Sequence, residues 1–325
     1  MENNNVTINQ QDLSRVKETA NKFITNVEKV VVGKKEAVEL VLVALLCESH
    51  VLIEDVPGIG KTVLAKAAAR SLGCSFKRIQ CTPDLLPSDI TGIHYFNQKT
   101  GEFEFRPGPI IANIVLVDEI NRATPRTQSC LLECMQEQQV TVDLDTIPLP
   151  RPFLILATQN PVELQGTFPL PEAQLDRFLM RIRLGYPDEN EEQNILLRFQ
   201  QNNPLDDLSS VIPAAELLEM QKLCRRVYID ESVRSYIVAL TRATRTNKNI
   251  ELGASPRATL GLSLAAQALA AIRGREFVIP DDVKYLAVPA LTHRLTARAE
   301  AKIKGRSLET MVKEIIDTIP VPVEK

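Results

Sequence analysis

Residues 55–62, DVPGIGKT, are of the types that bind phosphate groups. They fit the pattern GxxxxGK[ST] except at the first position, where Asp55 stands in place of glycine. Backbone N–H groups of such a loop, with the N-terminus of the helix that follows, can surround a phosphate. Lys61 then reaches the β- and γ-phosphates, and the Thr62 hydroxyl holds Mg²⁺. Glycine is scarce, at 13 of 325 residues, so two glycines within three positions argue against a chance turn.

A second group of reactive side chains ends an apolar run. Residues 114–119 read IVLVDE, a Walker B pattern in which Asp118 and Glu119 follow a predicted buried strand. Open α/β sheets bind ligands at the carboxyl ends of their strands. We expect Asp118 to coordinate Mg²⁺ and Glu119 to orient and deprotonate an attacking water. An acidic pair in this position is weak evidence by itself, so the prediction depends on its combination with the phosphate loop.

Three more polar residues are candidates for the same site. Asn160 follows the apolar run 153–157 and is placed to contact the γ-phosphate or the water, although an Asn-Pro pair also favours a turn. Arg177 is predicted on a short helix before the last strand, and Arg257 in the first turn of a later helix. Because a basic residue there opposes the helix dipole, Arg257 is expected to bind an external anion. A surface ion pair is the alternative for both arginines.

Composition limits the function classes. The net charge of −3 and the pI of about 5.8 do not favour a dedicated nucleic-acid binder, whose domain is usually basic. The N-terminus has no apolar signal-peptide core, and the longest apolar stretch is far shorter than the roughly 20 residues that span a bilayer. The six cysteines form no CxxC pair; Cys130 and Cys134 can share a helix face, but buried thiols explain them better than metal ligands. We expect a reduced, cytoplasmic protein.

The elements that must position these residues alternate between strand and helix. Short apolar runs predict parallel strands buried on both faces, at 50–54, 76–80, 114–117, 153–157 and 179–184. Intervening helices are predicted at 11–29, 34–47, 61–72 and 125–137. Two alternating segments, 93–105 and 140–149, are predicted as hairpins inserted into this layout.

The character of the chain changes after Tyr186–Pro187. Helices are predicted at 188–201, 213–226, 230–245, 255–273 and 280–288, with no strand among them. The sequence therefore predicts an α/β nucleotide-binding core over residues 1–186 and an all-α domain over 187–325. A guanine-reading NKxD pattern is absent, since residues 247–249 are Asn-Lys-Asn without the aspartate. ATP is thus favoured over GTP.

Five motifs in this order, VPGIGKT, VDEINRA, ATQNP, PEAQLDRF and GASPRA, resemble the MoxR family of AAA+ ATPases. The resemblance covers residues from about 30 to 300. It implies an AAA+ P-loop core with a five-stranded parallel sheet, a helical lid domain and assembly into a ring, usually a hexamer. It also implies that the predicted hairpin 93–105 is the insertion typical of this branch. The predicted hairpin 140–149 then corresponds to the hairpin that precedes sensor 1.

The resemblance assigns roles to single residues. Lys61 and Thr62 become the Walker A contacts, Asp118 and Glu119 the Walker B pair, and Asn160 sensor 1. Arg177 becomes the arginine finger, donated to the neighbour's nucleotide, and Arg257 becomes sensor 2, acting on its own nucleotide. Gln80 and Thr82 are candidates for the polar switch that holds the catalytic glutamate. The expected ATP-binding residues are Val32, Gly33, Pro57, Gly58, Ile59, Gly60, Lys61, Thr62, Val63 and Asp118, with Mg²⁺ on Thr62 and Asp118.

Two functions of different classes remain open, with a third that is close to the first. The resemblance favours Mg²⁺-dependent ATP hydrolysis coupled to chaperone-like remodelling, assembly or activation of a protein partner, typically one with a von Willebrand factor A domain. The alternatives are a nucleic-acid-directed ATPase and a chelatase-like motor subunit for metal insertion. The acidic charge and the lack of an appended DNA-binding domain argue against the nucleic-acid role. The aromatic hairpin residues 94–96, 103 and 105 either contact a partner or pack the hairpin against the core.

Overall fold

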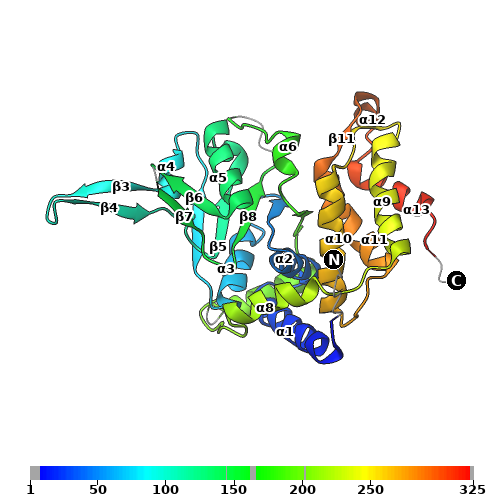
Figure 1. Ribbon diagram of the computed structural model, residues 1–325, viewed down its shortest axis with the longest axis horizontal. Helices are drawn as coiled ribbons and strands as arrows, with labels where there is room; N and C mark the ends of the chain where they lie inside the picture. Colours follow the sequence, from blue (N-terminus) through cyan, green and yellow to red (C-terminus); the bar gives the residue numbers. More distant parts are fainter. Residues whose placement is uncertain (1–7, 144, 162–165, 201–202, 323–325) are drawn as a thin grey trace, which may run out of the picture.

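The computed structural model describes residues 8–143, 145–161, 166–200 and 203–322 (Figure 1). Its centre is a five-stranded parallel sheet in the order β2-β5-β8-β1-β9. The strands are β1 (Val51–Glu54), β2 (Phe76–Gln80), β5 (Ile114–Asp118), β8 (Leu154–Gln159) and β9 (Met180–Ile182). The fold class predicted from the sequence, including all five strands, is confirmed.

Alternate residues of the three central strands, β5, β8 and β1, enter two different apolar cores. In β5, Ile114 and Leu116 pack into one core together with the N-terminal helices, the helix that follows the phosphate loop, and the C-terminal helices. Val115 and Val117 pack into the other core, against α5. This alternation explains why the strands read as uninterrupted apolar runs, since both faces of the sheet are covered.

Helices surround the sheet and form a separate group at the C-terminal end of the chain (Figure 1). The α/β part contains α1 (Gln10–Glu28), α2 (Lys35–Leu46), α3 (Lys61–Ser71), α4 (Pro87–Thr91), α5 (Pro125–Glu137) and α6 (Glu172–Leu175). The later helices are α7 (Glu189–Phe199), α8 (Ala214–Cys224), α9 (Glu231–Thr246), α10 (Pro256–Ile272), α11 (Pro280–Leu291), α12 (Ala299–Ile303) and α13 (Leu308–Thr318). Of these, α8 packs on α1 and α2 beside the sheet, while α9, α10, α11 and α13 pack on one another, and α10 also packs on α1, α2 and α8. The division into domains near residue 186 stays a prediction.

Three expectations for the C-terminal part were wrong or incomplete. The expected absence of strands is wrong, because β10 (Ile250–Leu252) and β11 (Thr296–Ala297) form an antiparallel pair. These strands have three and two residues, too few for a periodic pattern to reveal them. Helices α12 and α13 were not predicted. The expected helix 188–201 ends at Phe199 among the described residues, and residue 201 lies outside them.

Both predicted hairpins are present. The first pairs β3 (Gly92–Asn97) with β4 (Glu102–Pro107) and extends far from the body of the molecule (Figure 1). The second pairs β6 (Gln139–Val142) with β7 (Asp145–Pro148), and residue 144 lies outside the described residues. His94 of the first hairpin contacts Asp143 and Asp145 of the second, so the two hairpins are joined at the base of the longer one.

No helix in the described part of the chain is both long and apolar enough to cross a bilayer.

A buried histidine joins three elements of the α/β part. His50 lies directly before β1; its Nδ1 accepts a hydrogen bond from the Ile155 backbone N–H, and its Nε2 lies 3.0 Å from the Met135 carbonyl oxygen. Burial lowers the pKa of His50 to about 4, an effect that the hydrogen bond to Met135 opposes. The neutral imidazole satisfies both contacts, one as acceptor and one as donor.

The His50 site predicts that stability falls with acidification. A histidine with a native pKa near 4 stays neutral in the folded state, while in the unfolded chain it takes up a proton below about pH 6.5. The unfolded state therefore binds more protons between pH 6.5 and 4, and the free energy of unfolding decreases by about 2 kcal/mol from this group between pH 7 and 5. Urea denaturation of the wild type and of His50→Gln at both pH values measures this difference. Equal losses in the two proteins would contradict it.

Candidate functional site

The phosphate loop joins β1 to α3 as the motif predicted. Gly58 and Gly60 adopt φ angles of 85° and 92°, which side chains with a Cβ rarely tolerate. Gly60 is the N-cap of α3, so helix α3 starts at Lys61 and directs its free N–H groups toward the loop. Thr62 lies in the first turn of the same helix. The loop thus has the geometry of an anion site at a helix N-terminus.

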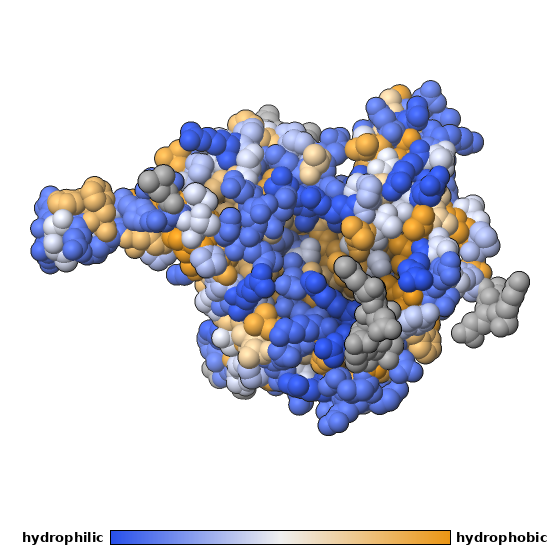
Figure 2. Space-filling model, in the orientation of Figure 1, coloured by the Kyte–Doolittle hydropathy of each residue, from blue (hydrophilic) through white to orange (hydrophobic). Residues whose placement is uncertain are grey.

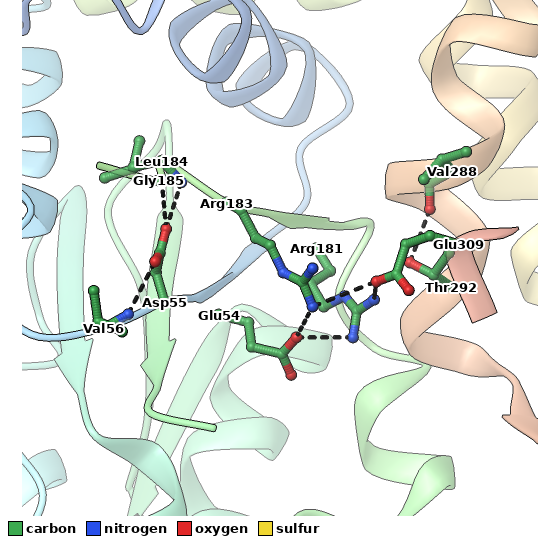
Figure 3. Close-up of polar contacts among 10 residues, drawn as sticks. All are labelled: Glu54, Asp55, Val56, Arg181, Arg183, Leu184, Gly185, Val288, Thr292 and Glu309. Carbon is green, nitrogen blue, oxygen red and sulfur yellow. Dashed lines mark hydrogen bonds and ion pairs between the residues drawn. The ribbon is translucent and has the colours of Figure 1, made fainter. Parts of the chain in front are cut away.

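Asp55, the departure from the motif, has a defined structural role. Its carboxylate accepts hydrogen bonds from the backbone N–H groups of Leu184 and Gly185 at 2.8 and 2.7 Å, and from Val56 at 2.9 Å (Figure 3). A glycine at this position has no side chain to make these contacts. The carboxylate therefore attaches the start of the phosphate loop to the segment that leaves β9 toward the later helices.

The two acidic residues of the site, Asp118 and Glu119, lie at the carboxyl end of β5. Asp118 accepts a 2.5 Å hydrogen bond from the Thr158 hydroxyl, and the same hydroxyl oxygen accepts a bond from the Glu119 backbone N–H at 2.9 Å. Glu119 adopts a left-handed conformation with φ of 55°, which is uncommon for residues other than glycine. Such strain is often kept at functional sites because neighbouring contacts enforce it.

Glu119 is restrained by neighbouring side chains. Gln80 Nε2 donates to a Glu119 carboxylate oxygen at 3.0 Å, and Arg122 Nη1 lies 3.2 Å from the same oxygen. Of the two candidates for the polar switch, the structure therefore brings Gln80 to the glutamate. The side chain of Thr82 instead bonds to the Asp84 carboxylate, a contact that lowers the pKa of Asp84.

Lys61 lies among the acidic groups of the site. Its Nζ donates to the Asp55 carbonyl oxygen at 2.6 Å. Burial lowers the pKa of Lys61, while the charges of Asp118, Asp55 and Glu119 act in the opposite direction. The ammonium group is thus close enough to both Walker B carboxylates to interact with them, as the predicted site requires.

A cavity of about 420 Å³ opens beside the phosphate loop. On one side it is lined by residues that the sequence predicted, namely Val32, Pro57, Gly58, Ile59, Gly60 and Val63. The opposite wall was not predicted and comes from Tyr186, Pro187 and α7, through Glu192, Ile195 and Phe199. A mostly apolar cavity with a phosphate loop at its edge suits a base and ribose next to bound phosphates.

Gly33 is an expected ATP-binding residue that does not line this cavity. It has a φ of 71°, and a Cβ built on it would collide with the Glu191 carboxylate. That carboxylate also forms an ion pair with Lys34 Nζ at 3.1 Å. It caps α7 by accepting a hydrogen bond from the Asp188 backbone N–H. Gly33 therefore allows the start of α7 to approach, and in this way forms the cavity indirectly.

The remaining predicted residues lie outside the cavity. Neither Arg177 nor Arg257 is among the described residues that line it. Arg177 was expected on a short helix, but α6 ends at Leu175, so Arg177 lies in the turn that follows. Arg257 is exposed in the first turn of α10, and Asn160 follows β8 next to the start of the phosphate loop, where Asp55 N–H donates to the Gln159 carbonyl.

The segments that carry Arg177 and Arg257 are linked through their neighbours Asp176 and Ser255, and Asp176 forms an ion pair with the buried Arg294, which sequence reasoning missed. Asp176 accepts hydrogen bonds from Ser255, the N-cap of α10, at 2.9 Å. It also lies 3.3 Å from Nε of Arg294, whose side chain is 3% exposed. Burial lowers the pKa of Arg294 to about 10; Asp176 opposes this effect, and the positive charge of Arg257 adds to it. The position of α10 is therefore coupled to the turn that carries Arg177.

A second ion-pair cluster connects the same two parts of the molecule next to the phosphate loop. Arg181 on β9 contacts Glu54 of β1 at 2.9 Å and also Glu309 at the start of α13 (Figure 3). Arg183 contacts the same two carboxylates at 3.0 and 3.4 Å. Since Glu54 directly precedes Asp55, this cluster attaches the start of the phosphate loop to α13, while the Asp55 contacts attach it to the segment that follows β9.

These features define a P-loop nucleotide-binding core with a helical lid, and the comparisons with known proteins agree. The model of the ATPase family associated with various cellular activities matches residues 50–180, and a model of the AAA lid domain matches residues 242–315. The chain is therefore an AAA+ ATPase.

Relatives over nearly the full length narrow the assignment. The chain is 41% identical to Chaperone MoxR1 of Mycobacterium tuberculosis, over 94% of this chain and 82% of that protein. It is 50% identical to Uncharacterized protein YeaC of Bacillus subtilis, over 94% and 95% of the two chains. The crystal structure of a proposed ATPase from Cytophaga hutchinsonii superposes with a TM-score of 0.90 at 38% identity, over 96% of this chain and 98% of that one. The chain belongs to the MoxR family of AAA+ ATPases.

The buried pair predicts an asymmetric effect on stability. Asp176→Asn leaves the Arg294 guanidinium buried without its counter-charge, so the free energy of unfolding should fall by about 3 kcal/mol. The matched control is Asp206→Asn, which removes a carboxylate paired with Arg70 at the surface and should cost about 1 kcal/mol or less. Denaturant titration of both variants tests this, and equal losses would show that the Asp176 pair does not act as a buried one.

Proposed function

We propose that this protein hydrolyses ATP with Mg²⁺ in a homo-oligomeric ring, such as a hexamer, and uses the reaction to remodel a protein partner. The observation that carries the proposal is the arrangement around the phosphate loop: Lys61 lies among the charges of Asp118, Asp55 and Glu119, while Arg177 lies in the turn after α6. One subunit therefore has the groups to bind phosphates and activate water, and an arginine from a neighbour completes the charge neutralisation.

The donor set fits Mg²⁺. The Thr62 hydroxyl and the Asp118 carboxylate are hard oxygen ligands, which this cation prefers. Asp118 already accepts a cation in the structure, the guanidinium of Arg78, so its carboxylate can take positive charge in place. When bound, the metal neutralises the charge that develops on the phosphoryl oxygens.

Each side chain then has a role in phosphoryl transfer. The loop N–H groups and Lys61 hold the β- and γ-phosphates, and the cavity beside α7 holds the base. Glu119 positions the water and takes its proton once Gln80 releases it. Asn160 contacts the γ-phosphate or the water as sensor 1, and Arg257 contacts the phosphates from the lid as sensor 2.

The contacts between core and lid couple hydrolysis to motion. Asp55 binds the Gly185 backbone on the segment that leads from β9 to the lid. Arg181 joins Glu54 to Glu309 of the lid, and Asp176 binds Ser255 at the start of α10. A change of phosphate state at the loop therefore alters contacts on both sides of the lid. Such a two-part element can convert hydrolysis into domain movement.

The long hairpin is the surface that we propose contacts the partner. Phe96 and Phe103 lie opposite each other near its tip, with ring centroids 5.4 Å apart, and are 52% and 73% exposed. Figure 2 shows the corresponding apolar patch at the far end of the hairpin, away from the body of the molecule. Exposed aromatic residues of this kind are enriched in protein interfaces. The name of the Mycobacterium tuberculosis relative, a chaperone, also supports a protein partner, and we propose one with a von Willebrand factor A domain in the cytoplasm.

The ring proposal predicts that ATP turnover depends on assembly. Turnover per subunit should rise with protein concentration, because the site is incomplete in an isolated subunit. Arg177→Ala should lower the plateau by about 10³-fold, the smaller value measured for arginine fingers, and should still bind ATP. Arg234→Ala, an exposed arginine on α9, is the matched control and should behave as the wild type.

Steady-state turnover across protein concentrations, with mass measured at each concentration, tests the prediction. Mixing Arg177→Ala with an excess of Glu119→Gln should restore part of the lost activity, because the second variant supplies Arg177 to the first. Turnover that is independent of concentration down to monomeric protein, with a normal Arg177→Ala, would show that the mechanism in trans is wrong.

A further inference from the structure

One arginine, Arg78, is connected to both acidic residues of the Walker B pair. Arg78 lies on β2, and its Nη2 and Nε are 2.6 and 3.2 Å from the same oxygen of Asp118. Nη2 also donates to the side-chain oxygen of Gln80 at 2.8 Å, and Gln80 in turn donates to Glu119 at 3.0 Å. A single guanidinium is therefore bound to Asp118 directly and to Glu119 through one amide.

The strand register makes this contact. Gln80 is paired with Asp118, and Arg78 is paired with Leu116, two residues earlier on β5. Side chains two residues apart on a strand point to the same face, so Arg78, Gln80 and Asp118 share one face of the sheet. Diagonal neighbours on adjacent strands are within reach of a long side chain. Helix α3, which begins with Lys61, packs on β2 and β5 at this end of the sheet.

Both oxygens of Asp118 are already used. One accepts from Arg78, and the other accepts from the Thr158 hydroxyl at 2.5 Å. The Asp118 side chain is 15% exposed, whereas Arg78 is 48% exposed on the edge strand β2. Arg78 can therefore leave toward solvent at little cost, while Asp118 cannot. A divalent cation and the guanidinium compete for the same carboxylate charge.

We propose that Arg78 is a positioning residue that competes with the divalent metal for Asp118. In the metal-free protein the guanidinium holds Asp118 and, through Gln80, restrains Glu119. Metal binding displaces Arg78, so Gln80 loses its other partner and Glu119 becomes easier to release toward water. This inference rests on the proposed function, since it assumes that Asp118 takes part in metal binding.

The test measures how much a metal strengthens nucleotide binding. The full-length chain is titrated with a fluorescent, slowly hydrolysed ATP analogue, once in EDTA and once with saturating Mn²⁺. The ratio of the two dissociation constants is the metal enhancement. Arg78→Ala should raise this ratio about two- to fivefold, the range for a half-exposed ion pair, and leave the affinity in EDTA unchanged. Arg78→Lys retains the positive charge but lacks the planar guanidinium, so its metal enhancement ratio should lie between those of the wild type and Arg78→Ala.

Lys77→Ala is the matched control. Lys77 is the exposed neighbour on β2 whose side chain alternates to the other face, so its enhancement ratio should equal that of the wild type. An unchanged or smaller ratio for Arg78→Ala, with a normal ratio for the wild type, would overturn the inference and leave the proposed function intact. A wild type whose affinity does not respond to Mn²⁺ would overturn both.

Discussion

The site depends on the parallel register of the central sheet. Because all five strands run the same way, their carboxyl ends lie at one edge, and each functional loop starts there. Glu54 at the end of β1 is paired with Gln159 at the end of β8, and Gln80 at the end of β2 with Asp118 at the end of β5. A shift of one residue in any strand would turn its side chains to the opposite face and separate the phosphate loop from its acidic partners. The two apolar cores that bury alternate residues fix this register.

The same edge of the sheet explains how a small change at the phosphates can reach the lid. Glu54 and Asp55 are consecutive, yet their carboxylates bind different structures: Glu54 binds Arg181 and Arg183, and Asp55 binds the backbone after β9 (Figure 3). On the other side of β9, Asp176 binds Ser255 and the buried Arg294. Strand β9 is therefore held to the lid at both ends.

The sequence was sufficient for the elements that combine local chemistry with periodicity. The phosphate loop, the Walker B pair and the five strands could be predicted because glycines, carboxylates and apolar runs stand in fixed local patterns. The second wall of the nucleotide cavity could not, because Tyr186, Ile195 and Phe199 read as an ordinary boundary and an ordinary amphipathic helix. Their role depends on where α7 folds back, which is set by the Lys34–Glu191 contact and the space at Gly33, pairs more than 150 residues apart. Arg294 and Arg78 were missed for the same reason, since a single arginine has no local pattern.

The charged groups of the site have partners within the described part of the chain. Lys61 donates to a loop carbonyl, Arg78 lies on Asp118, and Gln80 and Arg122 lie on Glu119, so the groups that catalysis needs have protein partners. In the proposed mechanism, a phosphate, a metal or a water takes over these contacts before hydrolysis. The free energy of nucleotide binding is therefore partly used to break these contacts, which lowers affinity but links binding to a change in the acidic cluster. Because Gln80 and Arg122 both contact one carboxylate oxygen of Glu119, the proposed role of this glutamate as a base requires these contacts to change.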